Sequence, residues 1–228
     1  MMQEPAQRAL TLMRTACPEE SPDALAELPV GQRNALLLTL RERLFGHRFS
    51  SVAVCHACGE RLEQQFDASD IRVAGPGDSA GPLALEVAGY AVRFRLPNTS
   101  DLTAIEGYGD AAEAERVLLE RCLLSARHDG RDITAGALPA EVVAAIADAM
   151  ERADPLAAIE LVLQCPTCGH RQSVSLDLVD YIWRELDAWA RRVLCEVHVL
   201  ASAYGWSERE ILNMRPWRRQ IYLEMAGR

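Results

Sequence analysis

Two short cysteine motifs contain the residues of this chain best suited to chemistry. Each is a Cys-x-x-Cys pair followed at once by glycine, over Cys55 to Gly59 and over Cys165 to Gly169. Two thiolates presented from a tight turn bind one metal ion, and the glycine permits the positive φ angle that directs backbone amides at sulfur. A structural zinc site needs four ligands, and each motif offers two. We therefore predict one Zn²⁺ site with four ligands: Cys55, Cys58, Cys165 and Cys168.

The two motifs lie in similar surroundings. A shift of 110 positions places Val52 on Val162 and Arg61 on Arg171. An apolar run precedes each motif and an alternating pattern follows it, which predicts two β-hairpins. Although 106 residues separate Cys58 from Cys165, closing such a loop costs about 4 kcal/mol. Structural zinc binding releases roughly 10–16 kcal/mol in small peptides, so a zinc ribbon split by an insert is favourable.

Other chemistries of paired cysteines fit less well. A thioredoxin-like motif would open a helix and would need only one copy. A c-type haem site needs histidine directly after the second cysteine, whereas here glycine intervenes before His170. Disulfides are disfavoured by the odd total of seven cysteines and by the lack of a secretory signal. His56 and His170 are spare ligand candidates that we expect to support the site or to face solvent.

Composition limits the class of protein. The chain has 228 residues, is 49% hydrophobic and carries a formal net charge of −9. No apolar run approaches the length of a membrane span, so we expect a cytoplasmic protein in which thiols stay reduced. The acidic balance argues against bulk electrostatic binding to nucleic acid. All 24 basic residues are arginine, which we attribute chiefly to codon bias.

Hydrophobic periodicity predicts an α+β fold in which a zinc-ribbon-like pair of hairpins contains a small α+β insert and is flanked by helices. The helix before the first hairpin should bury a stripe of leucines: Leu36, Leu37, Leu40 and Leu44. In the insert we expect a Gly/Pro-rich loop over 74–82, a hairpin turning at Gly89, and helices begun by Asp110 and by Pro139. The predicted parts are an N-terminal helical segment (1–47), the split zinc ribbon (48–73 plus 155–177), the insert (74–154) and a C-terminal helical region (178–228).

The C-terminal region offers surface for a partner. After a long helix over 178–203, two shorter helices carry aromatic and basic residues that we predict to bind a partner: Trp206, Trp217, Arg218 and Arg219. An alternative for the tryptophans is a small core, and a loose helix-turn-helix arrangement leaves DNA binding open, although acidic residues dilute the positive charge. We expect Cys122, Cys195 and His198 to pack inside helix faces. Because no catalytic motif emerges, the chain is not predicted to be an enzyme.

Several sequence features together resemble a known family, the baseplate hub assembly proteins or chaperones of T-even-type contractile phage tails. The resemblance is to the bacterial branch found with phage-tail-like contractile injection systems. It rests on segments along most of the chain: 31–38 through Phe45-Gly46, 55–63, 94–97 with Asp101-Leu102, 119–122, 165–170, 183–190, 196–198, 204–206 and 218–223.

The resemblance implies a non-catalytic protein that assembles the baseplate or forms part of it, located in the cytoplasm or within the assembled particle. Its implied partners are the hub and spike proteins at the end of the tube. Two other functions remain open from the residues alone. A zinc-ribbon regulator would bind nucleic acid in a salt-dependent way, and a thiol redox enzyme would contain a reactive cysteine of depressed pKa.

Overall fold

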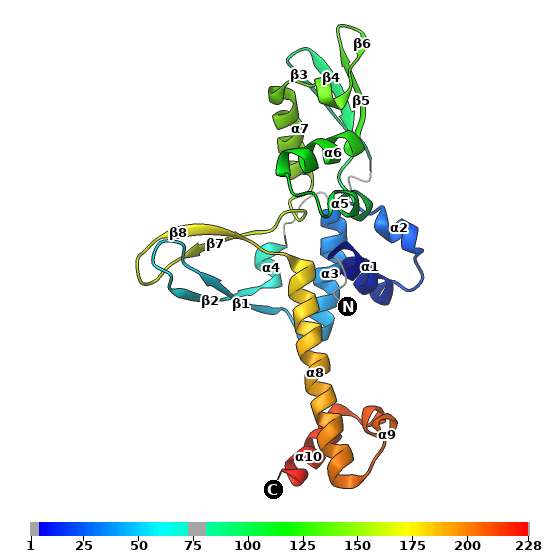
Figure 1. Ribbon diagram of the computed structural model, residues 1–228, viewed down its shortest axis with the longest axis vertical. Helices are drawn as coiled ribbons and strands as arrows, with labels where there is room; N and C mark the ends of the chain where they lie inside the picture. The colour runs from blue at the N-terminus through cyan, green and yellow to red at the C-terminus, as the bar shows by residue number, and fades with distance from the viewer. Residues whose placement is uncertain (1–4, 73–80, 228) are drawn as a thin grey trace. The chain divides into compact units, whose positions relative to one another are not determined.

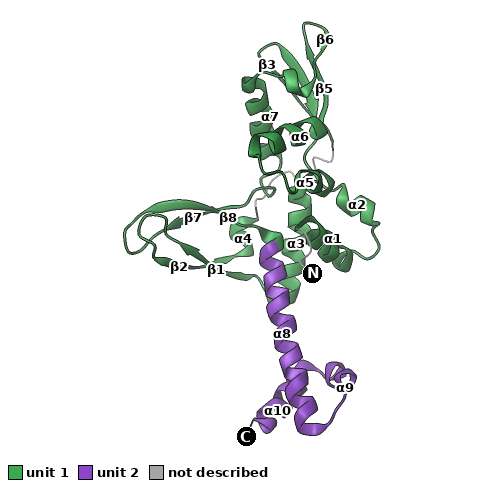
Figure 2. Ribbon diagram, viewed as in Figure 1, with its two compact units in different colours: residues 1–179 green, residues 180–228 purple. Residues whose placement is uncertain are grey.

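The protein is described from a computed structural model that places residues 5–72 and 81–227. The chain divides into two compact units, residues 1–179 and 180–228, which Figure 2 colours separately. Runs of helices are separated by pairs of antiparallel strands along the chain (Figure 1), and the α+β prediction is confirmed. Among the described residues, no helix is both long enough and apolar enough to cross a membrane.

The first unit begins with three helices, α1 (Pro5–Ala16), α2 (Pro22–Ala26) and α3 (Val30–Phe45). The hydroxyl of Ser21 accepts a hydrogen bond from the Ala24 amide and so caps α2. Gly46, at a φ of 84°, ends α3 and lets the chain turn directly into the first hairpin.

The buried face of α3 differs from the predicted leucine stripe. Leu37 and Leu38 are buried, but Leu44 is 52% exposed, and the buried face also contains polar residues. Arg33 donates to the side-chain oxygen of Asn34, and the side-chain nitrogen of Asn34 donates to the carbonyl of Leu156 at 2.8 Å. The helix turns this face inward because each polar group finds a partner there, which removes the cost of burying it.

Both predicted hairpins are present. Strand β1 (Arg48–Val54) pairs antiparallel with β2 (Arg61–Asp67), and β7 (Glu160–Gln164) pairs with β8 (Arg171–Ser175). Each pair forms a two-stranded sheet of its own. The two hairpins lie beside each other in Figure 1, and the short helix α4 (Ala68–Ile71) follows the first.

The insert is a small α+β unit whose sheet has two more strands, β5 and β6, than the predicted hairpin. Its sheet has the order β3-β4-β5-β6, and the third strand pairs with the second along Tyr90 to Phe94. The Gly/Pro-rich loop predicted over 74–82 lies largely outside the described residues. The strands are β3 (Leu83–Val87), β4 (Tyr90–Phe94), β5 (Leu123–His128) and β6 (Arg131–Asp132), and the helices are α5 (Thr99–Ile105), α6 (Ala111–Cys122), the 3-10 turn η1 (Ala135–Ala137) and α7 (Ala140–Ala153).

Strand β5 was missed because it starts at the residue after α6 ends, with no turn residue between them. The core of the insert forms where α7 packs against the sheet: Val92, Phe94, Ala126, Val142 and Ile146 are buried together. Asp110 caps α6 and Pro139 precedes α7, as predicted.

A buried carboxylate organises the base of the insert. Asp101 is fully buried, and it accepts hydrogen bonds from Arg95, from Arg121 and from the Asn98 amide. Burial alone would raise its pKa, but these donors hold the pKa of Asp101 below its ordinary value. Asn98 also donates to Glu27 at 2.7 Å, so the insert is joined to the N-terminal helices by paired polar groups.

A second junction links the end of the insert to α3. Asp154, the first residue after α7, accepts a hydrogen bond from the Gly31 amide at 2.9 Å, in the first turn of α3. Burial raises the pKa of Asp154, while the Gly31 amide and Arg33 act in the opposite direction. The segment that leads into β7 is therefore anchored at a helix N-terminus, where a negative charge is stabilised.

The second unit contains most of α8 (Leu178–Tyr204), followed by α9 (Glu208–Asn213) and α10 (Pro216–Ala226). Ser207 and Glu210 form a capping box at the start of α9. Leu200 and Ile211 are buried, and Trp206 stacks on Tyr204 with ring centroids 4.5 Å apart. The unit thus has a small core of its own.

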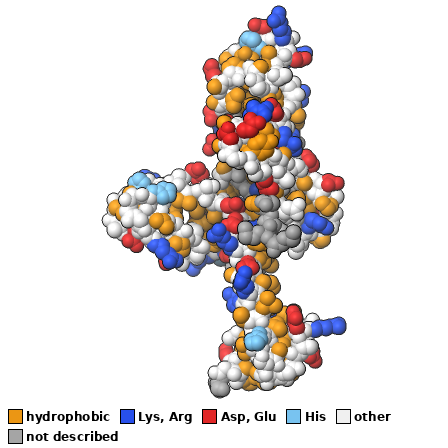
Figure 3. Space-filling view, in the orientation of Figure 1, with side chains coloured by type: hydrophobic (Ala, Val, Ile, Leu, Met, Phe, Trp, Pro, Cys, Tyr) orange, Lys and Arg blue, Asp and Glu red, His pale blue; other side chains and the backbone are white. Residues whose placement is uncertain are grey.

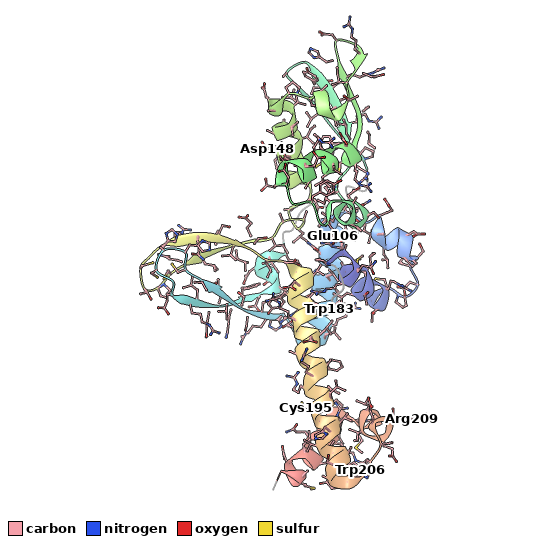
Figure 4. All side chains as sticks on the ribbon, viewed as in Figure 1. Glu106, Asp148, Trp183, Cys195, Trp206 and Arg209 are labelled. Atoms are coloured by element: carbon pink, nitrogen blue, oxygen red, sulfur yellow. The ribbon has the colours of Figure 1, made fainter. Side chains whose placement is uncertain are left out.

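Two predictions for α8 were wrong. Cys195 and His198 were expected inside an apolar helix face, but both are exposed; Figure 4 shows where Cys195 lies on the helix. The periodicity of α8 continues for many turns, but a long helix buries its apolar positions only where another element covers them. Cys122, in contrast, is buried as predicted.

Candidate metal centre

The two cysteine motifs fold into matching turns. The Gly59 amide donates to the Cys55 carbonyl at 2.9 Å, and the Gly169 amide donates to the Cys165 carbonyl at the same distance. Both glycines have a φ of 73°. The hairpin strands fix the two ends of each turn, and the glycine supplies the left-handed conformation that the turn requires. The similarity of sequence therefore extends to the backbone.

The structure brings all four predicted ligands together. The Sγ atoms of Cys55 and Cys168 are 3.7 Å apart, as are those of Cys58 and Cys165, and all four sulfur atoms lie within 4.8 Å of one another. A tetrahedral zinc ion with Zn–S bonds of about 2.3 Å separates its sulfur ligands by about 3.8 Å. The cluster therefore has the dimensions of a four-thiolate metal site.

Thiol ionisation also fits a site for a cation. The backbone amides of Cys168 and Thr167 lower the pKa of Cys165 to about 7. The amide of Glu60 favours the Cys58 thiolate, but the neighbouring sulfur atoms, Cys168 first, raise the pKa of Cys58 to about 12. Four thiolates this close would repel one another. A divalent cation relieves that repulsion and displaces the protons.

The first cysteine of each motif faces inward and the second faces outward. Cys55 and Cys165 are buried, and Cys58 and Cys168 are exposed. Two leucines, one from each hairpin, pack with the buried pair: Leu62 and Leu163. This apolar layer covers one side of the cluster and joins the two hairpins.

A glutamine that sequence reasoning missed connects the two hairpins. The side chain of Gln172, on β8, donates to the Val54 carbonyl at 2.9 Å and accepts from the His56 amide at 2.9 Å. It thus pairs with the backbone on either side of Cys55, as a neighbouring strand would. Under the shift of 110 positions Gln172 corresponds to Leu62, so comparing the two motifs could have drawn attention to this difference.

The remaining predicted site residues lie in the second unit, far along the chain from the cysteines. Trp217 and Arg218 are exposed on α10. Trp206 is half-buried between Tyr204 and Tyr222, and Figure 4 shows it just beyond the end of α8. Arg219 is largely buried; it pairs with Glu196 at 3.2 Å and donates to the Met214 carbonyl. Trp206 and Arg219 thus make contacts within the unit, and Trp217 and Arg218 face outward.

Known protein families include one that matches most of this chain. A family model described as T4 bacteriophage base plate protein matches residues 3–182. The matched span contains the N-terminal helices, both hairpins with their four cysteines, and the insert. The comparisons with curated proteins and with solved structures each found no match.

Proposed function

Because the chain belongs to the T4 bacteriophage base plate protein family, we propose that it assembles, or forms part of, the baseplate of a phage-tail-like contractile injection system. The single observation that carries this proposal is the family match over residues 3–182. The match supports a baseplate role at the level of the family. The bacterial injection system and a non-catalytic role are our extension, which rests on the sequence resemblance described above.

We further propose that the four cysteines hold Zn²⁺. The sulfur spacing and the all-thiolate ligand set suit a closed structural site, in which no position is open for a substrate. When bound, zinc would supply a permanent link between two hairpins separated by the insert. Such a link would stabilise the paired hairpins, because the free energy of metal binding contributes to folding.

We propose the hub and spike proteins of the particle as partners, with Trp217 and Arg218 in contact with them. In this proposal Trp206 and Arg219 do not touch the partner but support the fold of the second unit. Trp206 packs between two tyrosines, and Arg219 holds α10 to α8 through Glu196. Large exposed aromatic and arginine side chains dominate the binding energy of protein interfaces.

The zinc proposal is tested by metal content and stability. Purified protein should contain one zinc per chain by mass spectrometry of the metal. Cys168→Ser should lose most of the zinc and unfold the hairpins at a lower temperature, because thiolate ligation contributes to their stability. Cys195→Ser is the matched control, since Cys195 is exposed and outside the cluster. A Cys168→Ser protein with unchanged zinc and an unchanged melting temperature would refute the four-cysteine site.

The baseplate proposal is tested in the native host by quantitative mass spectrometry of purified contractile particles. Sedimentation of this chain at a fixed ratio to sheath and tube proteins identifies a permanent component. Its absence from particles, combined with loss of particles on gene deletion, identifies an assembly factor. If particles form normally without the chain, the proposed function is wrong.

A further inference from the structure

The second unit presents an apolar groove on α10. Three side chains spaced four residues apart line it, Trp217, Ile221 and Met225. Their exposed fractions are 61%, 42% and 58%. Residues four apart on a helix lie on one face, so these side chains form one continuous stripe. Figure 3 shows hydrophobic side chains on the surface of this unit.

The stripe is not needed for the core of the unit. That core is formed by Leu200, Ile211 and the aromatic stack around Trp206, and Arg219 fastens α10 through Glu196. A helix held by its other side, with three large apolar side chains left in solvent, has the features of a protein-binding surface. We call the stripe and the residues beside it the α10 groove.

The rim of the α10 groove is positive. Arg215 and Arg218 line it, and Arg218 lies over the Tyr222 ring at 5.6 Å. The acidic residue of the lining, Glu210, accepts hydrogen bonds from the amide and hydroxyl of Ser207 and serves the cap of α9. The balance of charge in this region differs strongly from that of the whole chain. Residues 180–228 contain eight arginines and seven acidic residues, whereas the whole chain has a net charge of −9.

We propose that the α10 groove binds one amphipathic helix of another baseplate protein, with an apolar stripe bordered by aspartate and glutamate. The identity of the partner as a baseplate protein rests on the proposed function, whereas its chemistry is inferred from the groove itself. Helix-in-groove recognition uses apolar anchors spaced by three or four residues, which matches the stripe. Acidic residues beside those anchors complement Arg215 and Arg218. Helix α10 has 11 residues, so it offers contacts to about three turns of the partner.

The experiment is photo-crosslinking in the native host with benzoylphenylalanine placed at Ile221, followed by sequencing of the crosslinked peptide. We expect one segment of a particle protein with apolar residues every three or four positions and an excess of acidic residues. A crosslink to nucleic acid, to a second copy of this chain, or to a neutral or basic segment overturns the proposal, as does the absence of any crosslink. The same photoreactive residue at Leu212, which is exposed but outside the groove lining, should not yield that adduct.

Two substitutions, each made in the chain that carries benzoylphenylalanine at Ile221, separate the apolar and the charged contributions to partner binding. Trp217→Ala should reduce the adduct at least tenfold, because tryptophan is among the residues most often found as interface hot spots. Arg218→Glu should reduce it at least fivefold. Arg209→Glu makes the same charge change outside the groove lining and should change the yield less than twofold; Figure 4 labels Arg209. Equal losses for both charge reversals would show long-range attraction alone and overturn the groove contact.

The outcomes distinguish this inference from the proposed function. An acidic helix from a protein that is not part of the particle would support the groove and count against the baseplate role. If the Trp217→Ala variant is retained in particles and its crosslink yield is unchanged, the baseplate role stands and the groove contact is refuted.

Discussion

The contact between Gly31 and Asp154 predicts that alanine at position 31 destabilises the protein, although helix propensity alone favours alanine over glycine. Gly31 lies in the first turn of α3, where alanine is ordinarily preferred to glycine by up to about 1 kcal/mol. In this structure a Cβ at Gly31 would lie 1.6 Å from Oδ1 of Asp154 and 2.6 Å from its Cγ. The carboxylate would have to move away. We therefore predict that Gly31→Ala is destabilising.

The magnitude follows from what the carboxylate loses. Its hydrogen bond from the Gly31 amide, at 2.9 Å, involves a charged group, and such bonds contribute about 1.5–3 kcal/mol. Steric displacement of packed neighbours costs a further ~1–3 kcal/mol. After subtracting the helix propensity of alanine, the expected loss is about 2–5 kcal/mol. This is a large share of the roughly 5–15 kcal/mol by which domains are stable.

Urea unfolding of the metal-loaded protein, followed by circular dichroism, measures this loss. Gly136→Ala is the matched control, because a Cβ there meets nothing within 4 Å, and it should change the free energy of unfolding by less than about 0.5 kcal/mol. In a double-mutant cycle, Gly31→Ala should cost little once Asp154 is alanine, so the two changes should couple by more than about 1 kcal/mol. A stabilising Gly31→Ala, or strict additivity with Asp154→Ala, would refute the reasoning.

Two further predictions concern paired polar groups. Gln172→Ala should weaken zinc binding about tenfold or more in a chelator competition assay, because Gln172 positions the backbone around Cys55. Supporting contacts of this kind typically contribute 10–100-fold to metal affinity. The control Gln65→Ala, at an exposed site on β2, should leave the zinc affinity unchanged. Asp101→Asn should cost about 3 kcal/mol near neutral pH. Since the folded-state pKa of Asp101 is lowered, its contribution is complete above the ordinary value of 3.8 and is lost as pH falls through the folded pKa. Acid titration of stability should therefore be shallower in Asp101→Asn, and an identical slope would count against the buried ion pairs.

Local signals were sufficient for most elements and for the cysteines proposed as metal ligands. The spacing of each cysteine motif, the glycine after it and the strands on either side specify the turn by short-range geometry alone. The four-cysteine cluster then follows because half a site cannot satisfy a metal. The caps at Asp110 and Ser207 are likewise set within one helical turn, so the sequence indicates them directly.

Burial of particular side chains was decided only by tertiary structure. Periodicity indicates that a helix has an apolar face, but the element that covers that face determines how much of it is buried. On α3 the neighbours accept Arg33 and Asn34 in the interior and leave Leu44 exposed. Cys195 is exposed although its helix is strongly periodic.

The sequence by itself determined the two hairpins, most of the helices and the choice of the four cysteines as candidate ligands, since these depend on residues close together in the chain. The tertiary structure decided how the parts connect. Gln172 reaches the backbone beside Cys55, and Asp154 reaches Gly31, across more than a hundred residues in each case. Such contacts depend on the final positions of backbone groups that no local pattern encodes. The physical reason is that a hydrogen bond requires a distance and a direction, and these exist only once the chain has folded.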